Sequence, residues 1–99
     1  MIAPHYTVIW APEIERRIAD YWVRSDSAER NRLTKIVHSI DHELSAAPER
    51  TGEMLEREAT TRFWVLSEFD PPVRVVFEFS PGDRIVSVLL LTLHGRRVY

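Results

Sequence analysis

The stretch VRVVFEFSPGDRIVSVLLLTL (73–93) decides the fold, because it contains two β-rich runs joined by a turn sequence. Both runs, 73–79 and 84–93, are rich in β-branched and aromatic residues, as β-strands usually are. Between them the tetrapeptide SPGD (80–83) places proline and glycine where a type II turn needs them. We therefore predict an antiparallel hairpin here.

The alternation of side chains in this hairpin predicts which face of the sheet is covered. In the first run the odd-numbered residues from Val73 to Phe79 are all apolar and share one face, whereas Arg74 and Glu78 lie on the other. The second run is apolar on both faces, as expected for a central strand. We expect helices to pack on the apolar face and the face of Arg74 to stay open.

Two more segments upstream are predicted to be strands. RFWVLSEF (62–69) precedes the hairpin and is separated from it by DPP (70–72), and HYTVIW (5–10) lies near the start of the chain. Residues 49–61 show no periodicity and are expected to form a loop.

Helical spacing of apolar residues predicts two helices between these segments. The first covers about 12–24 and starts at Pro12; the second starts at Asp26, which begins a capping-box-like sequence, and is stopped by Pro48. The order is β-α-α-β-β-β, so we predict one α+β domain (1–99) with an antiparallel sheet and a helical hairpin packed on one face.

The composition restricts the class of protein. Of 99 residues 44% are hydrophobic and 28% are charged, which is typical of a soluble globular domain and too apolar for intrinsic disorder. The absence of cysteine excludes disulfides, thiolate chemistry and Cys-ligated zinc. No signal peptide and no apolar run long enough to span a bilayer are apparent, so we expect a cytoplasmic protein without membrane partners.

The charge counts against a free-standing nucleic-acid binder. The formal net charge is -2, whereas phosphate contacts require an excess of Lys and Arg. The distribution is uneven, because after Asp83 the only formal charges are Arg84, Arg96 and Arg97, which His94 can join. These three arginines are candidate substrate-binding residues.

The predicted open face suggests a possible ribonuclease site. Cleavage of RNA by 2′-hydroxyl attack requires a base, cations on the phosphorane and an acid for the leaving oxygen. Arg62 and Arg74 are candidates to hold the phosphate, and His94 is the candidate acid. The base is left open among Glu78, Glu53 and Glu56; Trp64 and Tyr99 are candidates for stacking on a nucleobase.

Each of these residues also has a structural explanation. Arg74 and Glu78 on one strand can be a surface ion pair, and Trp64 can be a packing residue. The loop glutamates can serve solvation only, and Arg96 and Arg97 can serve solubility at the end of the chain.

The order of the elements and several local phrases resemble RelE/ParE-type toxins of bacterial type II toxin–antitoxin systems. The opening YTVIWAPEIERRIADYW (6–22) is similar to the family's first strand and helix. IDHELSAAPERTG (40–52) is similar to its Ile-Asp-x-x-Leu, then Pro, then Gly pattern. RFWVL (62–66) and PPVRVVFEFSPGDRIVSVLLL (71–91) are similar to its later strands, so the resemblance covers nearly the whole chain.

The resemblance implies a toxin that is neutralised by a cognate antitoxin protein and that needs no metal or cofactor. In the RelE branch such a toxin cleaves mRNA on the ribosome; Arg74 and Arg62 fall on arginines of that family, and His94 and Tyr99 fall near its C-terminal active positions. In the ParE branch the target is DNA gyrase and the nuclease residues are absent. Because Arg74 and His94 stand at suitable positions, we expect the ribosome-dependent mRNA endoribonuclease; the gyrase inhibitor and a family member without activity are the alternatives.

Overall fold

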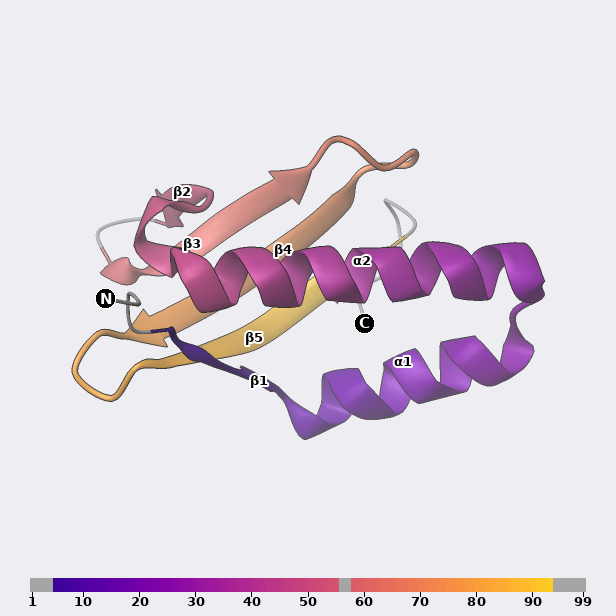
Figure 1. Ribbon diagram of the computed structural model, residues 1–99, viewed down its shortest axis with the longest axis horizontal. Helices are drawn as coiled ribbons and strands as arrows, with labels where there is room; N and C mark the ends of the chain where they lie inside the picture. Colours follow the sequence, from indigo (N-terminus) through magenta and orange to yellow (C-terminus); the bar gives the residue numbers. More distant parts are fainter. Residues whose placement is uncertain (1–4, 56–57, 94–99) are drawn as a thin grey trace.

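The computed structural model describes residues 5–55 and 58–93, which form two helices, a short 3-10 helix and one sheet (Figure 1). The helices α1 and α2 lie together on one face of the sheet, as predicted. The elements are β1 (Thr7–Trp10), α1 (Pro12–Arg24), α2 (Ser27–Ala46), η1 (Pro48–Arg50), β2 (Glu53–Leu55), β3 (Glu58–Leu66), β4 (Val73–Ser80) and β5 (Ile85–Thr92).

The sheet has five strands in the order β1-β5-β4-β3-β2 and is mixed. The strands β2 to β5 pair antiparallel, but β1 pairs parallel with β5, so the prediction of a wholly antiparallel sheet was wrong. The reason is the connection: tight turns force neighbouring strands to run in opposite directions, whereas β1 is followed by two helices, a connection long enough to permit parallel pairing.

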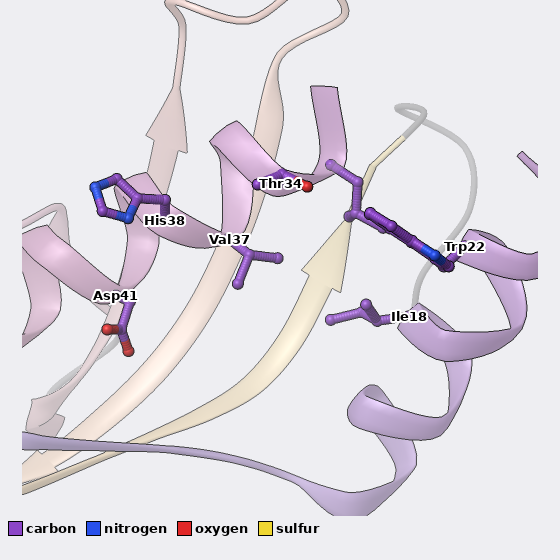
Figure 2. Close-up of a pocket in the computed structure, with 7 residues that line it drawn as sticks. Ile18, Trp22, Thr34, Val37, His38 and Asp41 are labelled. Carbon is purple, nitrogen blue, oxygen red and sulfur yellow. The ribbon is translucent and has the colours of Figure 1, made fainter. Parts of the chain in front are cut away.

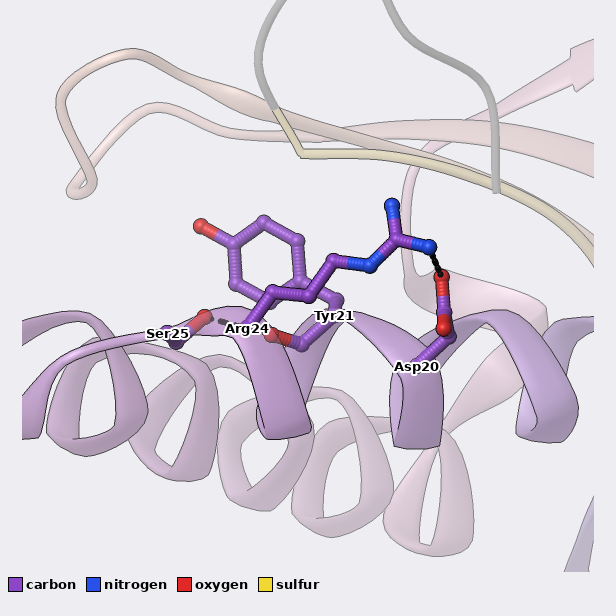
Figure 3. Close-up of polar contacts among 4 residues, drawn as sticks. All are labelled: Asp20, Tyr21, Arg24 and Ser25. Atoms are coloured by element: carbon purple, nitrogen blue, oxygen red, sulfur yellow. Dashed lines mark hydrogen bonds and ion pairs between the residues drawn. The ribbon is translucent and has the colours of Figure 1, made fainter.

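The predicted helices are confirmed because their signals are local in the sequence. Pro12 occupies the first turn of α1, and the side chain of Asp26 caps α2 by accepting a hydrogen bond of 2.8 Å from the backbone N–H of Glu29. At the hairpin between the helices, the hydroxyl of Ser25 donates to the carbonyl of Tyr21, beside an exposed ion pair of 3.4 Å between Arg24 and Asp20 (Figure 3).

The core lies between α2 and the covered face of the sheet. The apolar stripe of α2 is fully buried, and so are Val73, Val75 and Phe77 of β4, as predicted from the alternation. The buried residues of α2 are Leu33, Ile36, Ile40 and Leu44. Among the described residues, no helix has the length and apolar character needed to cross a membrane.

The loop predicted at 49–61 is instead structured. It contains η1, the edge strand β2 and the first residues of β3, which therefore begins at Glu58 and ends at Leu66 rather than running over 62–69. Residues 53–55 (EML) show no apolar alternation, so only their pairing with β3 makes them a strand. Gly52, at φ +70°, lies directly before β2, and it lets the backbone approach β3 so closely that an added Cβ would meet the carbonyl group of Phe63.

The turn between β4 and β5 also differs from the prediction. A type II turn would give Gly82 a positive φ, but the positive φ of +58° falls on Arg84, the last of four residues between the paired Ser80 and Ile85. The carbonyl of Arg84 accepts a hydrogen bond from the N–H of Thr7, so this conformation also fixes the start of β1.

We predict that Gly52→Ala lowers the free energy of unfolding by about 2 kcal/mol or more. An added methyl group would meet the carbonyl group of Phe63 and would lie 2.9 Å from Cβ of Trp64, at a φ that disfavours alanine. The matched control is Gly82→Ala, where a methyl group would meet nothing within 4 Å. Urea denaturation should show a change of less than about 1 kcal/mol for this control; equal effects would contradict the assigned role of Gly52.

Candidate functional site

The register between β3 and β4 determines on which face each candidate residue lies. Residues that pair directly across antiparallel strands point to the same face. Arg62 pairs with Phe77 and Trp64 pairs with Val75, so both lie on the face that the helices cover. Arg74 and Glu78 lie on the opposite face, with Val65 and Thr61 as their partners.

The prediction that Arg62 and Trp64 share the open face with Arg74 and Glu78 was therefore wrong. The sequence did not decide the parity of this strand, because apolar side chains occur at both parities: Phe63 and Val65 on one, Trp64 and Leu66 on the other. In the structure Leu66 is completely buried, so Leu66 and Trp64 lie on the covered face, and Phe63 and Val65 lie on the open face.

The guanidinium group of Arg62 binds the backbone of the preceding bend. Its Nε donates to the carbonyl of Thr51 and its Nη2 to the carbonyl of Gly52, both at 2.7 Å, and the side chain is half-buried. The planar fork of arginine suits two neighbouring acceptors of this kind. Arg62 therefore ties the bend before β2 to β3 and is not positioned to hold a substrate phosphate on the open face.

The other described candidates do not gather either. Trp64 is half-buried and packs against the core, so it is a packing residue rather than an exposed surface for stacking on a nucleobase. Arg84 lies at the β4–β5 turn, with its guanidinium 4.9 Å from the ring centre of Tyr6. Because Arg74 pairs with Thr92 at the other end of β5, Arg84 is about 25 Å away along the strand. No cationic cluster forms among the described arginines of 62–93.

The side chain of Arg74 is exposed, and it forms no hydrogen bond or ion pair with the side chain or backbone of another described residue. The interpretation of Arg74 and Glu78 as an ion pair was wrong, because four residues along a strand separate them by about 13 Å. Glu53 lies on the open face, since it pairs with Phe63. The remaining candidates, Glu56, His94, Arg96, Arg97 and Tyr99, lie outside the described residues.

The open face of the sheet carries an apolar patch instead. Phe63, Val76 and Leu90 follow one another across β3, β4 and β5 in directly paired positions. Val65, Ile9, Leu89 and Leu90 are each between 38% and 45% exposed. We call Ile9, Phe63, Val65, Val76, Leu89 and Leu90 the sheet patch.

A β-bulge at Leu89 produces part of this patch. Val88 pairs with Phe77 and Leu90 with Val76, so Leu89 is the extra residue between them. The bulge leaves Leu89 and Leu90 both exposed while Val88 and Leu91 on either side are fully buried. Sequence reasoning missed the patch, because the run of leucines indicated only a strand that is apolar on both faces.

The described part of the chain has an apolar surface on the open face, and the candidate residues within it do not come together there. It contains no group of three or more His, Asp or Glu side chains arranged to hold a metal ion. Comparisons with protein-family models, with curated proteins and with solved structures find no match to this chain.

We predict that Arg62→Leu lowers the free energy of unfolding by about 2 kcal/mol, since it leaves two half-buried carbonyls without their charged donor. Arg62→Lys should also destabilise, because a lysine cannot bridge both acceptors in the same planar geometry. The matched control is Arg74→Leu on the open face, which should change stability by less than about 0.5 kcal/mol. Urea denaturation tests this; a neutral Arg62→Leu would contradict the role in the bend.

Proposed function

We propose that this protein is a toxin of the RelE/ParE type that acts by binding a protein target and is neutralised by a cognate antitoxin. The observation that carries the proposal is the apolar sheet patch on the face that the helices leave open. Support for the toxin class comes from the resemblance of the sequence and from the observed order of elements, an N-terminal strand, a helical hairpin and a four-stranded antiparallel meander.

The sheet patch favours contact over catalysis. Aliphatic and aromatic side chains in a contiguous exposed area with charged residues around it are typical of a protein-binding surface. Arg74 and Glu53 lie on the same face and can form the polar rim. Cleavage of RNA would instead require several cationic groups around one phosphate, and Arg74 is the only cationic side chain that the described strands place on the open face.

The target that fits this proposal is DNA gyrase, as in the ParE branch. A gyrase inhibitor that acts by contact needs neither a general acid nor a phosphate-binding cluster. The antitoxin would then neutralise the protein by covering a surface that the target also needs.

One observation favours the ribosomal mRNA endoribonuclease as a second candidate. Arg74 pairs with Thr92, and His94 follows Thr92 by two residues in the sequence. In this alternative Arg74 holds the phosphate and His94 is the acid, while Arg62 keeps its structural role.

Induced expression in a bacterial host tests the proposal. We expect growth arrest by the wild type and by Arg74→Ala and His94→Ala, and loss of arrest in the double variant Val65→Lys/Leu90→Lys, which places two charges in the sheet patch while the lysine stems keep their contact with the sheet. Met54→Lys is the matched control, because Met54 is 58% exposed but pairs with Arg62 and so belongs to the other face. Circular dichroism and thermal unfolding show that each variant is folded.

Two biochemical readouts separate the alternatives. Purified protein should inhibit DNA supercoiling by gyrase, and primer extension on an abundant mRNA should show no new codon-aligned ends. Codon-aligned ends that disappear in Arg74→Ala and His94→Ala would replace the proposal with the nuclease. Absence of arrest in the wild type would leave only an inactive relative.

A further inference from the structure

The open face of the sheet carries two opposite charges that have no partner within the described chain. Arg74 and Glu78 both project from this face of β4, with Val76 between them. Both side chains are exposed, and neither forms a hydrogen bond or an ion pair with another described residue. They do not reach each other, because four residues along a strand span about 13 Å. This face of β4 is therefore cationic at one end and anionic at the other.

The centre of the sheet patch lies midway between these two charges. Phe63, Val76 and Leu90 form a row across three neighbouring strands in directly paired positions. In β4 this row is two residues from Arg74 and two residues from Glu78. Along β4 the order is thus a cation, an apolar row and an anion, which is symmetric in position and opposite in sign.

The anionic end of the face is hollowed. A hollow of about 370 Å³ has Glu78 in its lining, together with the hydroxyl-bearing residues Thr60, Ser80 and Ser87. Ser87 pairs directly with Glu78, so both side chains lie on the open face. Carboxylate and hydroxyl oxygens accept hydrogen bonds, and a guanidinium group offers five N–H donors. The hollow therefore suits the head of an arginine that comes from outside the chain.

A second copy of the chain supplies that arginine in the required place. A twofold axis that lies between two facing sheets, at right angles to β4 and level with Val76, reverses the direction of β4 in the second copy. Arg74 of each copy then lies over Glu78 of the other, and the apolar rows face each other. If the two β4 strands ran in the same direction, like charges would face each other instead. The charges thus select one of the two face-to-face arrangements.

The dimensions of the face determine how strong this contact is. Sheets that pack face to face lie about 10 Å apart, a gap that an arginine and a glutamate side chain span together. The patch covers four strands, so it is about 20 Å wide and about 20 Å long, or about 400 Å² of flat area for each copy. This is at the lower limit for specific complexes, so we expect a reversible dimer with a Kd of about 10 to 100 μM. Glu53 on the edge strand lies at the solvated margin, where water and salt screen its charge.

We propose that two copies of this chain pack face to face through the sheet patch, with their β4 strands antiparallel, so that each copy places Arg74 in the hollow beside Glu78 of the other. The dimer itself is inferred from the geometry of the face. Its consequence, that the dimer hides the sheet patch from a target, rests on the proposed function. Dissociation on dilution would then expose the patch.

Two complementary charge variants of the full chain test the arrangement. Arg74→Glu places a glutamate over Glu78 of the second copy, and Glu78→Arg places an arginine over Arg74. Each variant alone has like charges at both ends of the dimer, so its self-association should weaken at least about fivefold. In an equimolar mixture the two variants again form opposite-charge contacts at both ends. The heterodimer should therefore have a Kd within about twofold of the wild-type dimer.

The matched control places the same changes on the other side of the molecule. Arg16→Glu and Glu13→Arg alter exposed positions of α1, which lies on the covered face of the sheet. Each control variant should self-associate as the wild type does, and mixing the two should change nothing. Circular dichroism and thermal unfolding show that every variant is folded.

Sedimentation equilibrium of the wild type between about 5 and about 500 μM should show a monomer and a dimer in reversible exchange. A chain that stays monomeric throughout would overturn the proposal. So would a dimer that is insensitive to Arg74→Glu, to Glu78→Arg and to Val65→Lys/Leu90→Lys, because another surface would then form it. Weakened self-association of both single variants without recovery on mixing would overturn the antiparallel arrangement. None of these readouts involves a target, so they are independent of the growth test of the proposed function.

Discussion

The pairing of β3 with β4 is the constraint on which the rest of the molecule depends. It places Trp64 and Leu66 against the core and turns Phe63 and Val65 to the open face. The same pairing brings the guanidinium of Arg62 to the bend at Thr51 and Gly52, so one register fixes the core, the edge strand β2 and the open surface together. A slip of one residue would exchange all of these faces at once.

The parts of the fold that could be predicted from sequence are those with local signals. The boundaries of α1 and α2 follow from Pro12, Asp26 and helical periodicity, and the buried face of β4 follows from strict alternation. The strand β2 and the parallel pairing of β1 could not be predicted in this way, because both depend on partners far along the chain. The prediction of the site was wrong for a related reason. Which face each residue of 62–66 occupies depends on the register between β3 and β4, and the bulge at Leu89 depends on how β5 pairs with β4.

The molecule presents two apolar surfaces of different kinds, one on the sheet and one between the helices. The sheet patch lies on β-strands whose central backbone groups are already paired, so it offers side chains to a partner. Between the helices, Ile18, Trp22 and Val37 line a hollow, and the guanidinium of Arg30 lies 5.4 Å from the centre of the Trp22 ring (Figure 2). The two surfaces belong to different layers, so a partner on one does not by itself exclude a partner on the other.

The parallel pairing of β1 with β5 has a consequence for how the chain reaches this structure. The two strands come from nearly opposite ends of the described sequence, so the contact between Thr7 and Ile85 closes one of the longest loops in the protein. Helices and the β3–β4–β5 meander can form from neighbouring residues, whereas β1 can dock only after β5 exists. During synthesis β1 therefore stays without its sheet partner until β5 has left the ribosome, and the sheet closes as a late event in folding.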